Sequence, residues 1–271
     1  MNPVRNFKSN EYRDCNISRI VHSTVSNGVK IDCKVLGHKD LNEKIRQAIN
    51  HNDEEITLTN VNGQRYIASG LKAKVKITIK GTPGNDLGSF MNGPEITVYG
   101  NGQDAIANTM NEGKIIIHGH AGDVLGYAMR GGKLYIKGNV GYRVGIHMKA
   151  YKHLLPVLIV GGSARDFLGE YMAGGILILL GLKHKKEPVV GNYVGTGMHG
   201  GIIYIREEIE KYRLGKEIGM GRWMSQDDNI LRKYLLEYCQ EFSLNYDFIL
   251  KKKFSKLIPV SHRPYGKLYA Y

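Results

Sequence analysis

The chain of 271 residues is 42% hydrophobic and carries a net charge of +13, with 34 glycines, about twice the usual share of about 7%. No apolar run reaches the roughly 18–20 residues of a membrane span, and the polar first 14 residues lack a signal-peptide core, so no membrane association is expected. Three scattered cysteines, Cys15, Cys33 and Cys239, favour a reducing cytoplasm over a disulfide framework.

The positive charge suits either nucleic acid or acidic proteins as partners. A nucleic-acid interface is expected to show basic residues in a stripe with interleaved aromatics. Only roughly the last twenty residues show that mixture, which includes Arg263 and Tyr265. The pattern therefore disfavours nucleic acid, and either acidic partner proteins or the lysine-rich surface of a thermophile protein explains the charge as well.

Residues 1–70 are expected to form a small α/β cap at the N-terminal end of the fold. Asp40 is a plausible N-cap for a helix over 41–50, because apolar residues recur there at helical spacing. Two strands should follow, over 54–58 and 65–68, with Asn62-Gly63 as the hairpin turn between them.

A repeat of 19 residues dominates the middle of the chain. Short β-branched runs end at Gly81, Gly100, Gly119 and Gly138, which are 19 residues apart. Six methionines follow the same interval three times and then intervals of 24 and 26: Met91, Met110, Met129, Met148, Met172 and Met198. Three positions before each methionine is a glycine or alanine: Gly88, Ala107, Gly126, Gly145, Gly169 and Gly195.

A period near 20 with short strands and turn glycines is typical of one coil of a solenoid. Successive coils stack at about 4.8 Å, so equivalent side chains form columns. The Gly/Ala column marks a corner where a side chain would clash or where φ must be positive. The sequence therefore predicts a mainly β fold, a right-handed single-stranded β-helix of about seven coils over 71–206, with these methionines and glycines as its structural ladder.

Two coils contain insertions rich in lysine and histidine, at 149–156 and 183–190. Insertions in a solenoid map to loops on its outside. Lys152 and Lys185 are therefore candidate partner contacts, together with Arg263 and Tyr265 of the tail. Loops that only meet solvent are the alternative interpretation.

Residues 207–271 are expected to form a C-terminal helix and an extended basic and aromatic tail. Ser225 and Asp228 resemble a capping box. An apolar stripe follows at helical spacing: Ile230, Leu231, Tyr234, Leu235, Tyr238 and Phe242. We expect the helix to cap the far end of the solenoid or to dock on a partner, and the tail 248–271 to lie on its own domain or on a partner subunit.

Four segments resemble the glycine-rich C-terminal (GXGXG) domain of the glutamate synthase large subunit. They are Asn60–Tyr66, Gly84–Phe90, Asp166–Gly175 and Asn192–Ile205, and the last two, which resemble that domain's final coils, are the most specific. The resemblance covers roughly residues 31–206. The glycine-rich component of formylmethanofuran dehydrogenase shares the same solenoid and is the alternative family.

The resemblance implies a non-catalytic scaffold on a separate polypeptide. In glutamate synthase one domain releases ammonia from glutamine, an FMN barrel uses it to aminate 2-oxoglutarate, and the β-helix braces both. This chain has no N-terminal nucleophile cysteine and no FMN barrel. The resemblance therefore implies no catalytic, cofactor or metal residues and no activity alone. Its implied partners are a glutamine amidotransferase subunit and an FMN subunit with an iron–sulfur cluster. Three alternatives remain open: the chain as an independent binding module, a different amine product of the complex, and self-association of the chain.

Two groups of polar residues are conceivable ion sites. His118 and His120 form a pair with no obvious third ligand, which a metal site would need. Asp104, Asp123 and Asp166 recur six residues before ladder methionines. Stacked carboxylates repel one another, so these three are expected to accept turn N–H groups as Asx-turns do.

Overall fold

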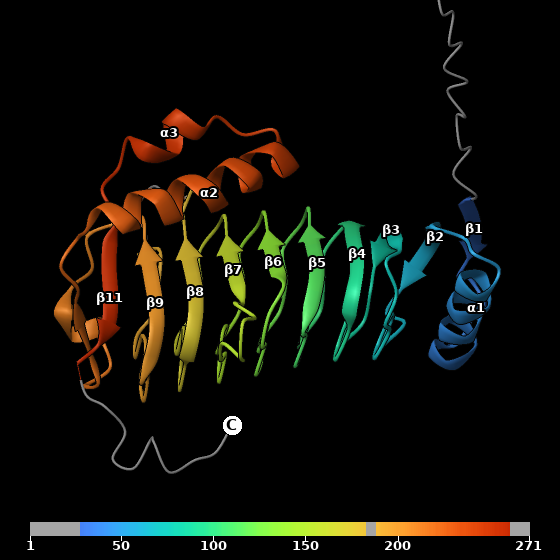
Figure 1. The fold of residues 1–271 in the computed structure, drawn as a ribbon, viewed down its shortest axis with the longest axis horizontal. Coiled ribbons are helices and arrows are strands. Elements are labelled where there is room, and N and C mark those ends of the chain that lie inside the picture. The colour runs from blue at the N-terminus through green and yellow to red at the C-terminus, as the bar shows by residue number, and fades with distance from the viewer. Residues whose placement is uncertain (1–27, 183–187, 261–271) are drawn as a thin grey trace, which may run out of the picture.

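The protein is described by a computed structural model over residues 28–182 and 188–260. One eleven-stranded sheet runs through it in the order β1-β2-β3-β4-β5-β6-β7-β8-β9-β11-β10. The first nine strands are parallel and stand side by side along the molecule (Figure 1). They are β1 (Gly28–Asp32), β2 (Glu55–Asn62), β3 (Lys76–Thr82), β4 (Asn92–Tyr99), β5 (Glu112–Ile117), β6 (Lys133–Ile136), β7 (Val157–Val160), β8 (Ala173–Leu179) and β9 (Gly200–Ile205). The predicted β-solenoid is confirmed.

Each coil passes through an arch in which three alternate residues have positive φ. In the first arch these are Tyr66, Ala68 and Gly70, with φ of 60°, 59° and 64°. The same pattern returns at 86–90, 105–109, 124–128, 143–147, 167–171 and 193–197. Seven arches enclose six complete turns, so the solenoid makes about six turns where about seven coils were expected.

The N-terminal segment contributes strands to the same sheet. Helix α1 (His38–Asn50) lies at the N-terminal end of the row and buries Leu41, Ile45 and Ala48 in the solenoid core (Figure 1). Its N-cap is Gly37 with no side-chain cap bond, so the assignment of Asp40 was wrong.

The expected hairpin around Asn62-Gly63 is also wrong. Strand β2 pairs with β3 in parallel register as far as Asn62, and residues 65–68 belong to the first arch. Parallel stacking on the next coil provides the backbone partners that a hairpin would have supplied.

The far end of the solenoid is closed by antiparallel strands. Strand β11 (Ser255–Pro259) pairs with β9, and β10 (Ile218–Met220) pairs with β11. The described part of the tail thus lies on its own sheet. The short helices η1 (Lys211–Arg213) and α3 (Tyr246–Leu250) complete this region.

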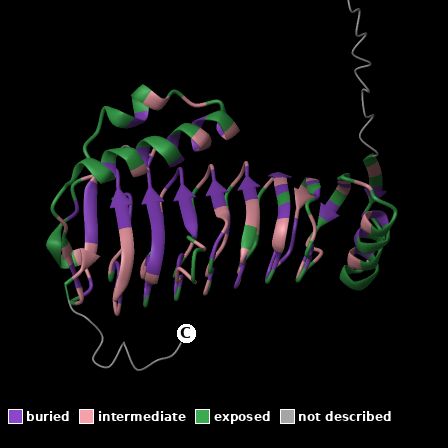
Figure 2. Cartoon of the chain, in the orientation of Figure 1, coloured by how far each residue is buried: buried purple, intermediate pink, exposed green. Residues whose placement is uncertain are grey.

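Helix α2 (Ser225–Phe242) lies along the outer face of the sheet instead of capping its end (Figure 1). Its side chains Leu231, Tyr234, Leu235, Tyr238 and Phe242 form a second core with outward residues of β5–β9. The C-terminal halves of these strands are accordingly buried on both faces, whereas β2–β4 show exposed residues along their length (Figure 2).

The sequence of the outward column explains where the helix sits. In register, β2–β4 present Thr57, Thr78 and Thr97, and the next five strands present Ile116, Tyr135, Ile159, Ile178 and Tyr204. The apolar part of the column needs a cover to remove it from water, and the threonine part does not.

Candidate partner interface

The ladder residues fill the interior of the solenoid. All six methionines are at most 1% exposed. Backbone hydrogen bonds join successive coils at these methionines. Asn111 N donates to the carbonyl of Met91 at 3.0 Å, and Arg130 N donates to that of Met110 at 2.9 Å. Leu71 takes the same place after the first arch and is 5% exposed, a rung that the methionine pattern did not reveal.

The glycine column lies at the middle of each arch, against the interior. Gly126 has φ of 66°, and a Cβ added there would lie 2.8 Å from Leu158 Cδ1. Ala107 occupies the same place at φ of 61°, so this corner accepts one methyl group in a neighbouring coil. The ladder therefore has a packing role.

The aspartate column bonds one coil to the next. Asp104 Oδ1 accepts from Asp123 N at 2.9 Å, Asp123 Oδ1 accepts from Tyr142 N at 2.8 Å, and Asp166 Oδ1 accepts from Asn192 N at 2.7 Å. The expected acceptance of backbone N–H groups is confirmed, but the donor belongs to the following coil and not to the same turn.

The two histidines of the conceivable metal pair have separate structural contacts. His120 Nδ1 accepts from Asn139 N at 2.9 Å. The His118 ring stacks on Tyr99 at 4.6 Å between centroids and meets the edge of Phe242 at 5.2 Å. Burial and the nearby Lys137 ammonium lower the pKa of His118. Across residues 28–182 and 188–260, no group of three or more His, Cys, Asp or Glu side chains is arranged to hold a metal ion.

The first insertion and Arg130 of the preceding coil form a small basic loop cluster, defined here as Arg130, Lys149, Tyr151 and Lys152. The Tyr151 ring has Lys152 Nζ at 5.3 Å and Arg130 Cζ at 5.7 Å from its centroid. Burial and the nearby Arg130 guanidinium lower the pKa of Lys149. Lys152, a candidate contact, is exposed in this cluster, whereas Lys185, Arg263 and Tyr265 lie outside the described residues.

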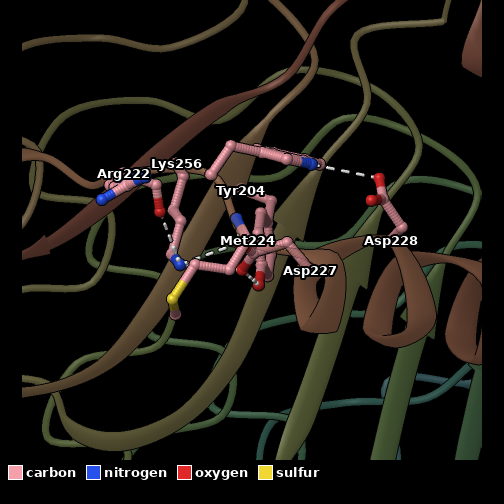
Figure 3. A network of polar contacts seen from close by, with 7 residues as sticks. Tyr204, Arg222, Met224, Asp227, Asp228 and Lys256 are labelled. Atoms are coloured by element: carbon pink, nitrogen blue, oxygen red, sulfur yellow. Dashed lines mark hydrogen bonds and ion pairs between the residues drawn. The ribbon is translucent and has the colours of Figure 1, made fainter.

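A buried ion pair fixes the start of α2 (Figure 3). Lys256 Nζ lies 2.8 Å from Asp227 Oδ1, and both side chains are at most 4% exposed. The Tyr204 hydroxyl donates to Asp227 Oδ1 at 2.6 Å, and Met224 N donates to Asp227 Oδ2 at 2.6 Å. Burial raises the pKa of Asp227, but these partners outweigh it and hold that pKa below its ordinary value. The helix is thus capped by Asp227, while Asp228, named in the expected capping box, instead accepts from Trp223 Nε1 at 3.0 Å.

The last three arches carry an aromatic edge, defined here as Arg143, His147, Phe167, Tyr171 and Tyr193. The rings of His147 and Tyr171 stack at 5.2 Å between centroids, and those of Phe167 and Tyr193 stack at 5.0 Å. Arg143 Cζ lies 4.7 Å from the centroid of Phe167. The methionine alignment did not reveal this edge. Its residues lie five positions before Met148, Met172 and Met198, and one position before Met148 and Met172.

Comparison with known proteins places this fold in a family. The chain is 49% identical over 250 residues to "Uncharacterized protein MJ1350" of Methanocaldococcus jannaschii, a match that covers 89% of this chain and 96% of that protein. The model of the GXGXG motif family matches residues 31–260 and so includes α2 and β11 as well as the coils. In the described residues no helix is long and apolar enough to cross a membrane. The chain belongs to the GXGXG motif family, which includes the C-terminal domain of the glutamate synthase large subunit.

Proposed function

We propose that the chain is the non-catalytic scaffold subunit of a glutamate synthase-like complex. Its partners are a glutamine amidotransferase subunit and an FMN-binding synthase subunit, and the FMN and an iron–sulfur cluster belong to those partners. The membership of residues 31–260 in the GXGXG motif family is the observation that carries this proposal.

The packing of the solenoid supports a bracing role. The interior columns of aliphatic and methionine side chains are fully buried, and the carboxylates and imidazole between coils accept backbone N–H groups. Such groups hold neighbouring coils in register. A stiff rod with two closed ends is suited to keeping two other proteins at a fixed separation.

The basic loop cluster supports an acidic partner. Arg130, Lys149 and Lys152 lie near one another around Tyr151, on a chain of net charge +13. Opposite charge on a partner steers association and fixes its orientation more than it adds affinity. We therefore assign Lys152 to a contact with a partner subunit.

Purification of the chain alone and with candidate partners tests the proposal. The chain alone is expected to show no flavin absorbance and no glutamine-dependent amination of 2-oxoglutarate. Co-expression with glutaminase-type and FMN-type subunits from the same genome is expected to give one co-eluting complex whose activity requires the FMN and glutaminase subunits. The scaffold role is refuted by a yellow preparation of the chain alone with bound FMN, and copurification with a molybdenum or tungsten protein would favour the formylmethanofuran dehydrogenase-type alternative.

A further inference from the structure

The fold does not require large side chains along the aromatic edge. At the first residue of the third to the seventh arch the chain has Ala105, Val124, Arg143, Phe167 and Tyr193, all with φ between 56° and 64°. Small residues therefore satisfy this position in the third and fourth arches. Left-handed backbone costs a non-glycine residue roughly 1–2 kcal/mol, so folding alone gives no reason for the change to arginine and aromatic residues.

The fifth residue shows the same change from the third arch to the sixth, although Phe90 already holds this place in the second arch. Thr109 and Ala128 precede His147 and Tyr171, with φ between 50° and 54° throughout. The Tyr171 ring leans over the next arch, where a Cβ on Gly197 would lie 2.3 Å from Tyr171 Cδ1. The first column is thus large over the last three arches, and the second is large over the fifth and sixth, since the seventh has Gly197.

These rings remain open to solvent. Tyr193 is 55% exposed and Tyr171 is 44% exposed. Parallel stacking of each ring on its neighbour holds it in one orientation, so little conformational entropy remains to be lost on binding. Exposed, preorganised tyrosine and arginine side chains are typical of the residues that dominate binding energy at protein interfaces.

A groove of about 430 Å³ borders the edge and adds positive charge. Its lining includes Tyr142, Arg165, Asp166 and Arg213. Arg165 is exposed and lies with Cζ 5.5 Å from the Tyr142 ring centroid. The Asp166 carboxylate accepts a backbone N–H through Oδ1, and Arg213 Nε donates to Glu210 at 3.1 Å. Arg165 is therefore the guanidinium of the groove that is best placed to meet a carboxylate from outside.

We propose that the aromatic edge and the groove beside it bind an acidic surface of a partner protein. Aromatic and proline side chains of that partner pack on Tyr171 and Tyr193, and one of its carboxylates pairs with Arg165. Arg143 of the edge is already ion-paired with Glu170, so the exposed guanidinium of Arg165 and the charge of +13 on this chain select the acidic partner. This inference rests on the proposed function, because the glutaminase-type and FMN-type subunits are the proteins to be tested.

The test measures the dissociation constant of the full-length chain for each of those two subunits, by calorimetry at low and moderate salt. Tyr193→Ala and Tyr171→Ala are each expected to weaken binding of one subunit about 30-fold, as for central aromatic residues of interfaces. Arg165→Glu is expected to weaken it about tenfold, with a smaller effect as salt rises.

Tyr99→Ala is the matched control. Tyr99 is 56% exposed and also stacks on a histidine, but it lies at the end of β4, away from the edge. It is expected to leave binding unchanged, and circular dichroism is expected to show all four variants folded.

Three results would overturn the inference. If both subunits bind the edge variants as tightly as the wild-type chain, the edge is not the interface and the scaffold proposal stands. If the wild-type chain binds neither subunit at low salt, the scaffold proposal and the inference fail together. If the wild-type chain forms a dimer that Tyr171→Ala abolishes, the edge serves self-association instead.

Discussion

At the scale of single residues, the solenoid depends on positions where the backbone is left-handed and faces the core. Gly126 is such a position, with Leu158 Cδ1 only 2.8 Å from where its Cβ would lie. Ala107 shows that one methyl group is accepted where the neighbouring coil leaves room. The size of the side chain at each arch is therefore set by the coil above it.

We expect Gly126→Ala to lower the free energy of unfolding by about 1–2 kcal/mol, the cost of a left-handed alanine, because the flexible end of Leu158 can shift away from one added methyl group. Gly126→Val is expected to cost several kcal/mol more and to yield largely insoluble protein, because a β-branched side chain adds a clash with Leu158 to that cost. Denaturant unfolding of both variants measures this. An unchanged midpoint for the valine variant would contradict the inward orientation of this column.

Sequence periodicity predicted the interior residues and missed most of the outward ones. Met91 and the five methionines after it were found because identical side chains recur at equal intervals. Leu71 was missed because leucine replaces methionine and the interval to Met91 is one residue longer. The aromatic edge was missed because outward positions share no residue type that folding enforces from coil to coil.

At the scale of elements, α2 is held by contacts with five different strands. The Tyr238 hydroxyl donates to the carbonyl of Ile136 at 3.0 Å, and Lys114 Nζ pairs with Glu241 at 2.7 Å. The buried side of the helix was predicted correctly from its apolar stripe. Its place on the outer face was not predicted, because that prediction requires the register between strands. The register places Thr97 and Ile116 next to each other in one outward column.

We expect Leu235→Ala to lower the free energy of unfolding by about 2–5 kcal/mol, because Leu235 is fully buried between α2 and the sheet. Leu236→Ala is the matched control, since its side chain is 39% exposed and its loss is expected to change stability by less than about 0.5 kcal/mol. Urea unfolding followed by circular dichroism gives both values. Equal effects of the two changes would contradict the packing of α2 on the strands.

At the scale of the whole molecule, the two ends differ in how much covers the sheet. Strands β5–β9 are packed on both faces, whereas β2–β4 present Thr57, Thr78 and Thr97 without a covering helix. In a solenoid each coil is stabilised mainly by its neighbours, so local differences in cover are not averaged over the molecule. Local opening is therefore expected to be easier toward the N-terminal end.

We expect backbone amides of β2–β4 to exchange with deuterium about tenfold or more faster than those of β6–β8. Hydrogen–deuterium exchange with peptide mapping measures this directly, and the amides of α1 report on the end of the core separately. Uniform protection from β2 to β9 would mean that the coils open as one unit and that α2 adds no local stability.

The span of α2 has a consequence for how the molecule grows. From Asp227 beside Tyr204 to Phe242 beside His118, the helix rises about 22 Å, close to the roughly 19 Å of four strand spacings between β9 and β5. Duplication of a 19-residue unit ahead of β5 would lengthen the rod without disturbing either anchor. The same duplication between β5 and β9 would add one strand spacing of about 4.8 Å, so α2 would be too short to reach both anchors. The length of α2 therefore limits the number of coils that it covers.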